Sequence, residues 1–90
     1  MPQLQLLVGG RVQGVGYRWF CRSRAEQHGV QGTVRNLADG TVAIVAEGEH
    51  GALAAFHADV LRGPLAARVE AIQERWGECT HGLRGFEILG

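Results

Sequence analysis

The spacing of apolar residues along this chain switches between a period of two and a period near 3.6, which limits the folds it can adopt. Segment 3–12 alternates apolar and polar residues, as a strand with one buried face does. Segment 17–28 carries apolar residues at helical spacing, and Gly29 is placed to end that helix. By the same criteria we predict strands over residues 3–12, 30–36, 41–47, 67–76 and 83–89, and helices over residues 17–28 and 50–61.

This order of elements, β-α-β-β-α-β with a possible further strand at the C-terminal edge, predicts an α+β protein. We expect a ferredoxin-like sandwich, in which an antiparallel sheet of four to five strands carries two helices on one face. The Asp39-Gly40 pair is a strong turn signal between the second and third strands. Such a fold serves enzymes, regulatory modules and RNA-binding domains, so function has to be argued from the residues.

Ninety residues, 46% of them hydrophobic, are enough for one compact core but not for two, so we predict a single domain over residues 1–90. We find no apolar stretch near the ~20 residues of a membrane span and no pattern of a signal peptide. Cys21 and Cys79 are too few for a disulfide framework. We expect reduced thiols, with Cys21 in the core, and a monomeric cytoplasmic protein without membrane partners.

All nine basic residues other than histidine are arginine. The absence of lysine excludes a Walker-type phosphate loop and Schiff-base chemistry. The formal net charge is zero, but the first 36 residues are basic, with Arg11, Arg18, Arg22, Arg24 and Arg35 against Glu26 alone. This asymmetry could steer an anion toward the first third of the chain, or it could reflect a solvated helix face.

Residues 10–18 lie where the first predicted strand meets the first predicted helix. Glycines there permit a tight turn and let backbone N–H groups converge on one point. The start of the helix adds unpaired donors and a partial positive charge, so the segment could bind an oxyanion. Gly14 and Gly16 could equally serve only the turn. The glycine spacing differs from that of a dinucleotide-binding fingerprint.

Arg18 is the residue that favours anion binding in this segment. A cation in the first turn of a helix is disfavoured by the helix dipole by ~0.3–1 kcal/mol, and an anion beside it removes that penalty. Its guanidinium also offers a planar fork that binds two phosphate oxygens at once. Residue type and position together therefore favour a phosphate ligand.

Two motifs in this chain resemble those of the acylphosphatase family. Residues 10–18, GRVQGVGYR, resemble the first signature, glycine-x-valine-glutamine-glycine-valine-x-aromatic-arginine. Residues 32–36, GTVRN, resemble the second, with the family's later positions filled at the expected intervals by Gly40, Val42 and Gly48. The resemblance extends over nearly the whole chain.

The resemblance implies an enzyme that hydrolyses the carboxyl-phosphate anhydride bond of acyl phosphates. Arg18 would bind the phosphate and Asn36 would orient the attacking water. The phosphate would be surrounded by the backbone of Gln13, Gly14, Val15, Gly16, Tyr17 and Arg18. Thr33 stands where the family usually has an aromatic residue, and residues 86–90 lack the usual arginine-tyrosine ending. We expect these departures to affect packing and substrate contacts but not the reaction type.

The chemistry of an acyl phosphate suits these residues. Its carboxylate leaving group has a conjugate acid of pKa near ~4, so it departs without protonation and no general acid is needed. The remaining task is to bind the phosphoryl group and aim a water, which is positioning and electrostatics. We expect no cofactor and no metal, and no residue stands out as a contact for the acyl group.

The sequence offers few residues for nucleophilic catalysis by a side chain or for metal binding. Ser23 lies inside a predicted helix, where we expect a surface hydroxyl, and Cys21 fits a buried helix face better than a reactive thiol. His50 and His57 could share a helix face, but without a third ligand we interpret them as solvated histidines. Asn36, taken without the family motif, could be a turn former.

Two other functions fit the same order of elements. A binding module could keep the anion site without turnover, as in subdomains of carbamoyl-transfer maturation enzymes. An RNA-recognition domain stacks bases on aromatic residues of the sheet. Here Tyr17, Trp19 and Phe20 fall on the first predicted helix, and the net charge is zero, so we expect no nucleic-acid partner.

Overall fold

The computed structural model describes residues 1–78 and 82–90 of the chain. Within these residues the chain forms five strands and two helices, close to the predicted bounds. In chain order they are β1 (Pro2–Arg11), α1 (Tyr17–His28), β2 (Gln31–Asn36), β3 (Val42–Glu47), α2 (His50–Arg62), β4 (Arg68–Glu78) and β5 (Phe86–Ile88). The prediction that Cys79 is a reduced thiol lies outside the described residues.

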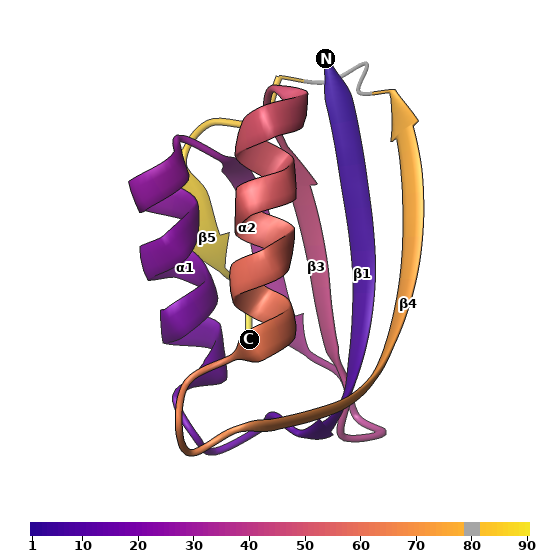
Figure 1. Cartoon of the computed structure of the whole chain (residues 1–90). Coiled ribbons are helices and arrows are strands. Elements are labelled where there is room, and N and C mark those ends of the chain that lie inside the picture. Colours follow the sequence, from indigo (N-terminus) through magenta and orange to yellow (C-terminus); the bar gives the residue numbers. More distant parts are fainter. Residues whose placement is uncertain (79–81) are drawn as a thin grey trace.

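The strands form one sheet in the order β4-β1-β3-β2-β5, and both helices cover the same face of it (Figure 1). The ferredoxin-like α+β sandwich predicted from the sequence is thereby confirmed. The pairs β1–β3, β1–β4 and β2–β3 are antiparallel, as expected. β5 instead runs parallel to β2, so the sheet is mixed.

β5 is shorter than the segment predicted to form it. The prediction extended over residues 83–89, whereas the strand contains only residues 86–88. Leu83 does not enter the ladder, because its backbone N–H donates to Oε1 of the buried Glu47 at 3.1 Å. Beyond the strand, Leu89 N donates to Val34 O at 2.8 Å, so the tail continues alongside β2.

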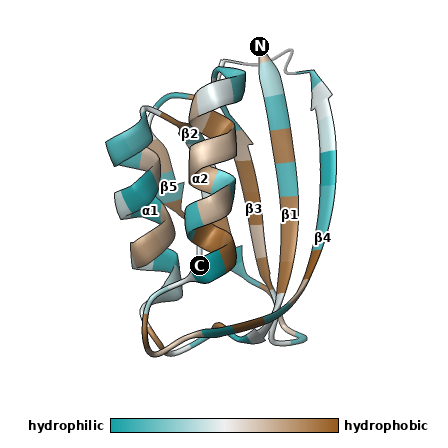
Figure 2. Ribbon diagram, viewed as in Figure 1, coloured by the Kyte–Doolittle hydropathy of each residue, from teal (hydrophilic) through white to brown (hydrophobic). Residues whose placement is uncertain are grey.

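The core lies between the sheet and the helices. Along β1, Leu4, Leu6 and Val8 are buried under the helices while Gln5 and Leu7 are exposed on the open face. Figure 2 shows bands of opposite hydropathy toward the start of β1 and a continuous hydrophobic stretch further along it. The strand therefore has the half-buried pattern that its sequence predicted.

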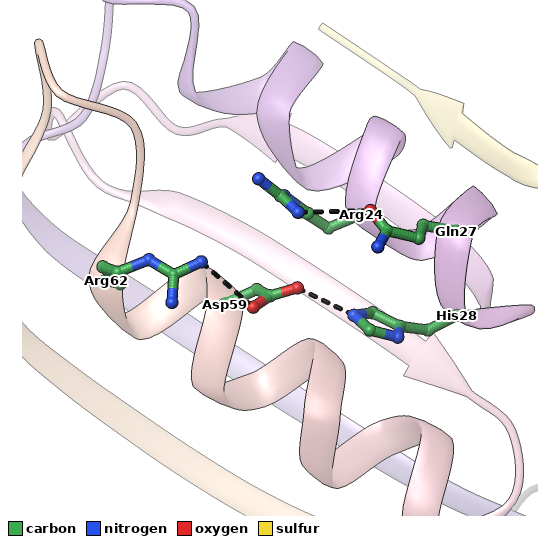
Figure 3. A network of polar contacts seen from close by, with 5 residues as sticks. All are labelled: Arg24, Gln27, His28, Asp59 and Arg62. Atoms are coloured by element: carbon green, nitrogen blue, oxygen red, sulfur yellow. Dashed lines mark hydrogen bonds and ion pairs between the residues drawn. The ribbon is translucent and has the colours of Figure 1, made fainter.

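Two contacts between α1 and α2 fix how the helices sit on the sheet. At the start of α1, the hydroxyl of Tyr17 donates to the carbonyl oxygen of Val60 at 2.7 Å, and this bond is buried. At its end, His28 Nε2 lies 2.7 Å from Asp59 Oδ2, and Arg62 lies 3.2 Å from the other oxygen of Asp59 (Figure 3). The hydrogen bond from His28 lowers the pKa of Asp59.

Among the described residues, neither helix combines the length and the apolar character that a membrane span requires.

Candidate functional site

The loop between β1 and α1 has the geometry expected of an anion-binding turn. Gly16 caps α1 in the left-handed conformation, with φ 77°, and Gly14 has φ 73°. A side chain is strained at such φ values, which explains why glycine occupies both positions. Within the part of the chain that the structure describes, no side chain caps the start of α1, and its first turn contains no acidic residue. The first N–H groups of the helix therefore stay available to a ligand.

Gln13 connects this loop to the hairpin between β2 and β3. Its Nε2 donates to the carbonyl oxygens of Leu37 and Thr41, both at 2.9 Å. The side chain of Gln13 thus holds the hairpin against the loop, while its backbone remains part of the predicted phosphate site. Sequence reasoning had assigned Gln13 a backbone role alone, because nothing local to the motif indicates which carbonyl groups its amide reaches.

Arg18 and Asn36 meet at one atom. The guanidinium Nη1 of Arg18 donates to the main-chain oxygen of Gly90, and the backbone N–H of Asn36 donates to the same oxygen at 3.1 Å. Arg18 lies in the first turn of α1, whereas Asn36 is the last residue of β2. The structure therefore brings the two predicted catalytic residues to the same end of the sandwich.

Gly90 belongs to this site although the sequence did not identify it. From the sequence, residues 83–89 were predicted to form a strand and residues 86–90 were noted as a departure from the family's usual ending, but no role in the site was assigned to Gly90. Gly90 reaches the site because β5 pairs with β2 and the chain continues along β2 to its end. No local sequence signal indicates that pairing.

The side chain of Asn36 does not form the neighbouring turn. That turn is closed by Asp39, whose carboxylate accepts bonds from the backbone N–H and the hydroxyl of Thr41, at 3.0 and 2.6 Å. These bonds lower the pKa of Asp39. Oδ1 of Asn36 is buried and has no hydrogen-bond partner within residues 1–78 and 82–90. Within the described residues, this oxygen is therefore a hydrogen-bond acceptor whose capacity is unused.

The other chemically notable residues lie apart from the loop or are inert. Cys21 is fully buried, as predicted, and burial raises the pKa of its thiol to about 12. Ser23 is exposed on α1. The described residues contain no group of three or more histidine, cysteine or acidic residues that could bind a metal ion.

One prediction about the histidines was wrong. His57 was expected to be solvated, but its side chain is only 20% exposed and Nε2 lies 2.8 Å from Glu74 Oε2 on β4. His50 is exposed and stacks on Trp76 with ring centroids 5.7 Å apart, while His57 meets the same ring edge-on at 6.4 Å. Both histidines lie on α2 facing the edge strand β4, which the spacing on α2 alone could not reveal.

Taken together, these features define a class of protein. It is a ferredoxin-like sandwich with a glycine-rich loop at the start of α1, an arginine, Arg18, in the first turn of that helix, and an asparagine, Asn36, at the end of β2. A sequence model of the acylphosphatase family matches residues 4–88. The acylphosphatase of Thermus thermophilus is 50% identical over 88 residues, covering 98% of this chain and 99% of the relative. The chain therefore belongs to the acylphosphatase family, a family of hydrolases that act on acyl phosphates.

Solved structures agree with this assignment. The crystal structure of acylphosphatase from Bacillus subtilis matches with a TM-score of 0.96 at 37% identity, and the match covers 100% of both chains. The crystal structure of T. kodakarensis HypF matches with a TM-score of 0.87 at 32% identity, covering 99% of this chain but 12% of HypF. The same layout thus also occurs inside a much longer protein.

Proposed function

We propose that the loop at residues 13–18 binds the phosphate of an acyl phosphate and that a water held by Asn36 attacks it in line. One observation carries this proposal: Arg18 and Asn36, on different elements, share a single oxygen of Gly90. A group that binds phosphate and a group that orients water must lie within one substrate's length of each other. The contact of the Arg18 side chain and the Asn36 backbone N–H with one oxygen supports that proximity.

The phosphate would be bound by charge and by backbone donors. A guanidinium has five N–H donors, so the contact of Arg18 with Gly90 leaves others for two phosphate oxygens. Gly90 also restricts where the long side chain of Arg18 points. The backbone N–H groups of residues 13–18 and the uncapped start of α1 would complete the site.

Asn36 would position the nucleophile. Its buried Oδ1, which has no partner among the described residues, would accept a hydrogen bond from a water and turn a lone pair of that water toward phosphorus. A bond forms between the water oxygen and phosphorus, and the bond from phosphorus to the acyl oxygen breaks. The carboxylate leaves with the electron pair, and the water's proton passes to an oxygen of the phosphate.

Attack by water, rather than by a side chain, fits the residues near the loop. Cys21 lies one helical turn from Arg18, but burial raises the pKa of its thiol and disfavours the thiolate. Tyr17 begins α1, but its hydroxyl is buried, bonded to Val60, and has a raised pKa. Neither group is suited to forming a phosphoenzyme.

Hydrolysis of benzoyl phosphate in water labelled with heavy oxygen tests the proposal. Attack at phosphorus places the label in inorganic phosphate, whereas attack at the carbonyl carbon places it in benzoate. The reaction is run in chelated buffer with inorganic phosphate as a competitive inhibitor. Label in benzoate, or turnover that requires an added metal ion, contradicts the proposal.

A further inference from the structure

A hollow of about 410 Å³ lies between α1 and β5, outside the phosphate-binding loop. It is lined by Trp19 and Arg22 of α1 and by Phe86, Glu87 and Ile88 of β5. Trp19 is 63% exposed. A tryptophan left so open to solvent is unusual for its size, because burying its ring would be strongly favourable.

The hollow adjoins the site at Arg18 from two sides. Trp19 lines the hollow and follows Arg18 directly in the first turn of α1, so the two side chains start from adjacent backbone positions of the helix, although they leave it in different directions. Ile88 stands two residues before Gly90, the residue that Arg18 and Asn36 contact, and two residues span at most about 7 Å. A substrate whose phosphate lies at Arg18 can therefore extend its other end into this hollow.

The charges in the hollow favour an uncharged occupant. Arg22 is already engaged, with Nε 3.5 Å from Glu26 and its guanidinium 5.5 Å from the centre of the Trp19 ring. Glu87 adds a negative charge to the lining, which disfavours an acyl group bearing a second carboxylate. The part of the Trp19 ring that the Arg22 guanidinium leaves uncovered and the side chain of Ile88 supply apolar surface.

We propose that this hollow binds the acyl group of the substrate and that Trp19 selects uncharged aromatic acyl phosphates over acetyl phosphate. This inference rests on the proposed function only in that it places the phosphate at Arg18. The aromatic acyl group would stack on or against the indole ring, which an acetyl group is too small to cover. Trp19 would act on specificity and not on the bond-breaking step.

The test compares Trp19→Ala with the parent chain on two substrates. For benzoyl phosphate we expect kcat/KM to fall roughly tenfold, the scale of one lost aromatic contact. For acetyl phosphate, and for inhibition by inorganic phosphate, we expect no more than about a twofold change. Trp19→Phe should restore most of the benzoyl activity, and Leu65→Ala, at a fully exposed position outside the hollow, should change neither substrate.

Equal losses on both substrates, or an unchanged ratio of the two kcat/KM values, would overturn the inference. The outcome is separate from that of the proposed function, which is decided by Arg18 and Asn36 variants and by the position of the heavy-oxygen label. A selective loss of benzoyl activity in Trp19→Ala supports the acyl site, whereas the Arg18 and Asn36 variants decide where the phosphate lies.

A binding measurement provides a readout without turnover. The chain has two tryptophans, so Trp76→Phe leaves Trp19 as the sole fluorophore of its kind. We expect phenylphosphonate to change the fluorescence of Trp19 with saturation at the concentration that inhibits hydrolysis. Inorganic phosphate should cause a much smaller change, and an equal change with both probes would contradict occupancy of the hollow by the aromatic ring.

Discussion

The guanidinium of Arg18 and the backbone N–H of Asn36 donate to the same atom, the main-chain oxygen of Gly90. The three residues come from the first helix, the end of the second strand and the last position of the chain. Their convergence gives the proposed phosphate ligand and the proposed water-orienting residue a common, fixed reference point. It leads to predictions that separate binding from chemistry.

Arg18→Lys and Arg18→Gln should both abolish measurable hydrolysis of acyl phosphates, with a fall in kcat/KM of about a hundredfold or more. Lysine keeps the charge but loses the planar fork, so it should not rescue activity. Steady-state phosphate release measures the effect, and an unchanged far-UV circular dichroism spectrum shows that the fold is intact. Near-normal turnover in either variant would remove Arg18 from the mechanism.

Asn36→Ala should lower kcat on the order of a hundredfold while inhibition by inorganic phosphate is largely retained. The variant loses the buried Oδ1 that would hold the water, but it keeps the backbone N–H that contacts Gly90. Initial rates across a range of phosphate concentrations measure both quantities. A parallel loss of phosphate inhibition would show that Asn36 acts in binding instead.

Gln13→Ala should destabilise the fold and reduce activity together. Its amide satisfies the carbonyl oxygens of Leu37 and Thr41, and a lost hydrogen bond to a partly buried group costs about 1–2 kcal/mol in the free energy of unfolding. Urea unfolding and kcat/KM measure the two effects. Gln5→Ala is the matched control, because Gln5 is exposed and its side-chain amide donates to the side chain of Gln3 on the surface. Equal stability of the two variants would contradict the role given to Gln13.

Asp59→Asn should weaken the contact between α1 and α2 at near-neutral pH but not at strongly acidic pH. The hydrogen bond from His28 lowers the pKa of Asp59 in the folded chain below its usual value of 3.8, so the unfolded chain binds the proton more readily. The stability from this group is therefore present above that value and is lost as the pH falls through the lower, folded-state pKa. We expect a cost of about 1 kcal/mol at near-neutral pH that vanishes once the pH falls below the folded-state pKa of Asp59.

Denaturant unfolding of Asp59→Asn at several pH values measures this dependence. Glu70→Gln, which removes an exposed carboxylate on β4, is the control and should follow the parent chain throughout. A destabilisation of Asp59→Asn that is the same at every pH would show that the carboxylate charge contributes nothing to the contact.

The elements and the sandwich were predictable because their signals are local. Periods of two and 3.6 identify strands and helices within single segments, and Gly29 and Asp39-Gly40 mark the ends and turns that separate them. The loop was also predictable, since Gly14, Gly16 and Arg18 stand together in one motif. The sequence thus determined which segments fold into which elements, and it named the residues at the start of α1.

Only the tertiary structure decided which distant residues contact the start of α1. The parallel pairing of β5 with β2 carries Gly90 to Arg18 and Asn36 and opens the hollow beside Trp19. The packing of α2 against β4 pairs His57, which was predicted to be solvated, with Glu74. Each contact joins residues at least 17 positions apart, and its formation depends on strand order and direction. A repeating pattern within one segment cannot encode that order, because the free energy that selects it comes from burying many segments together.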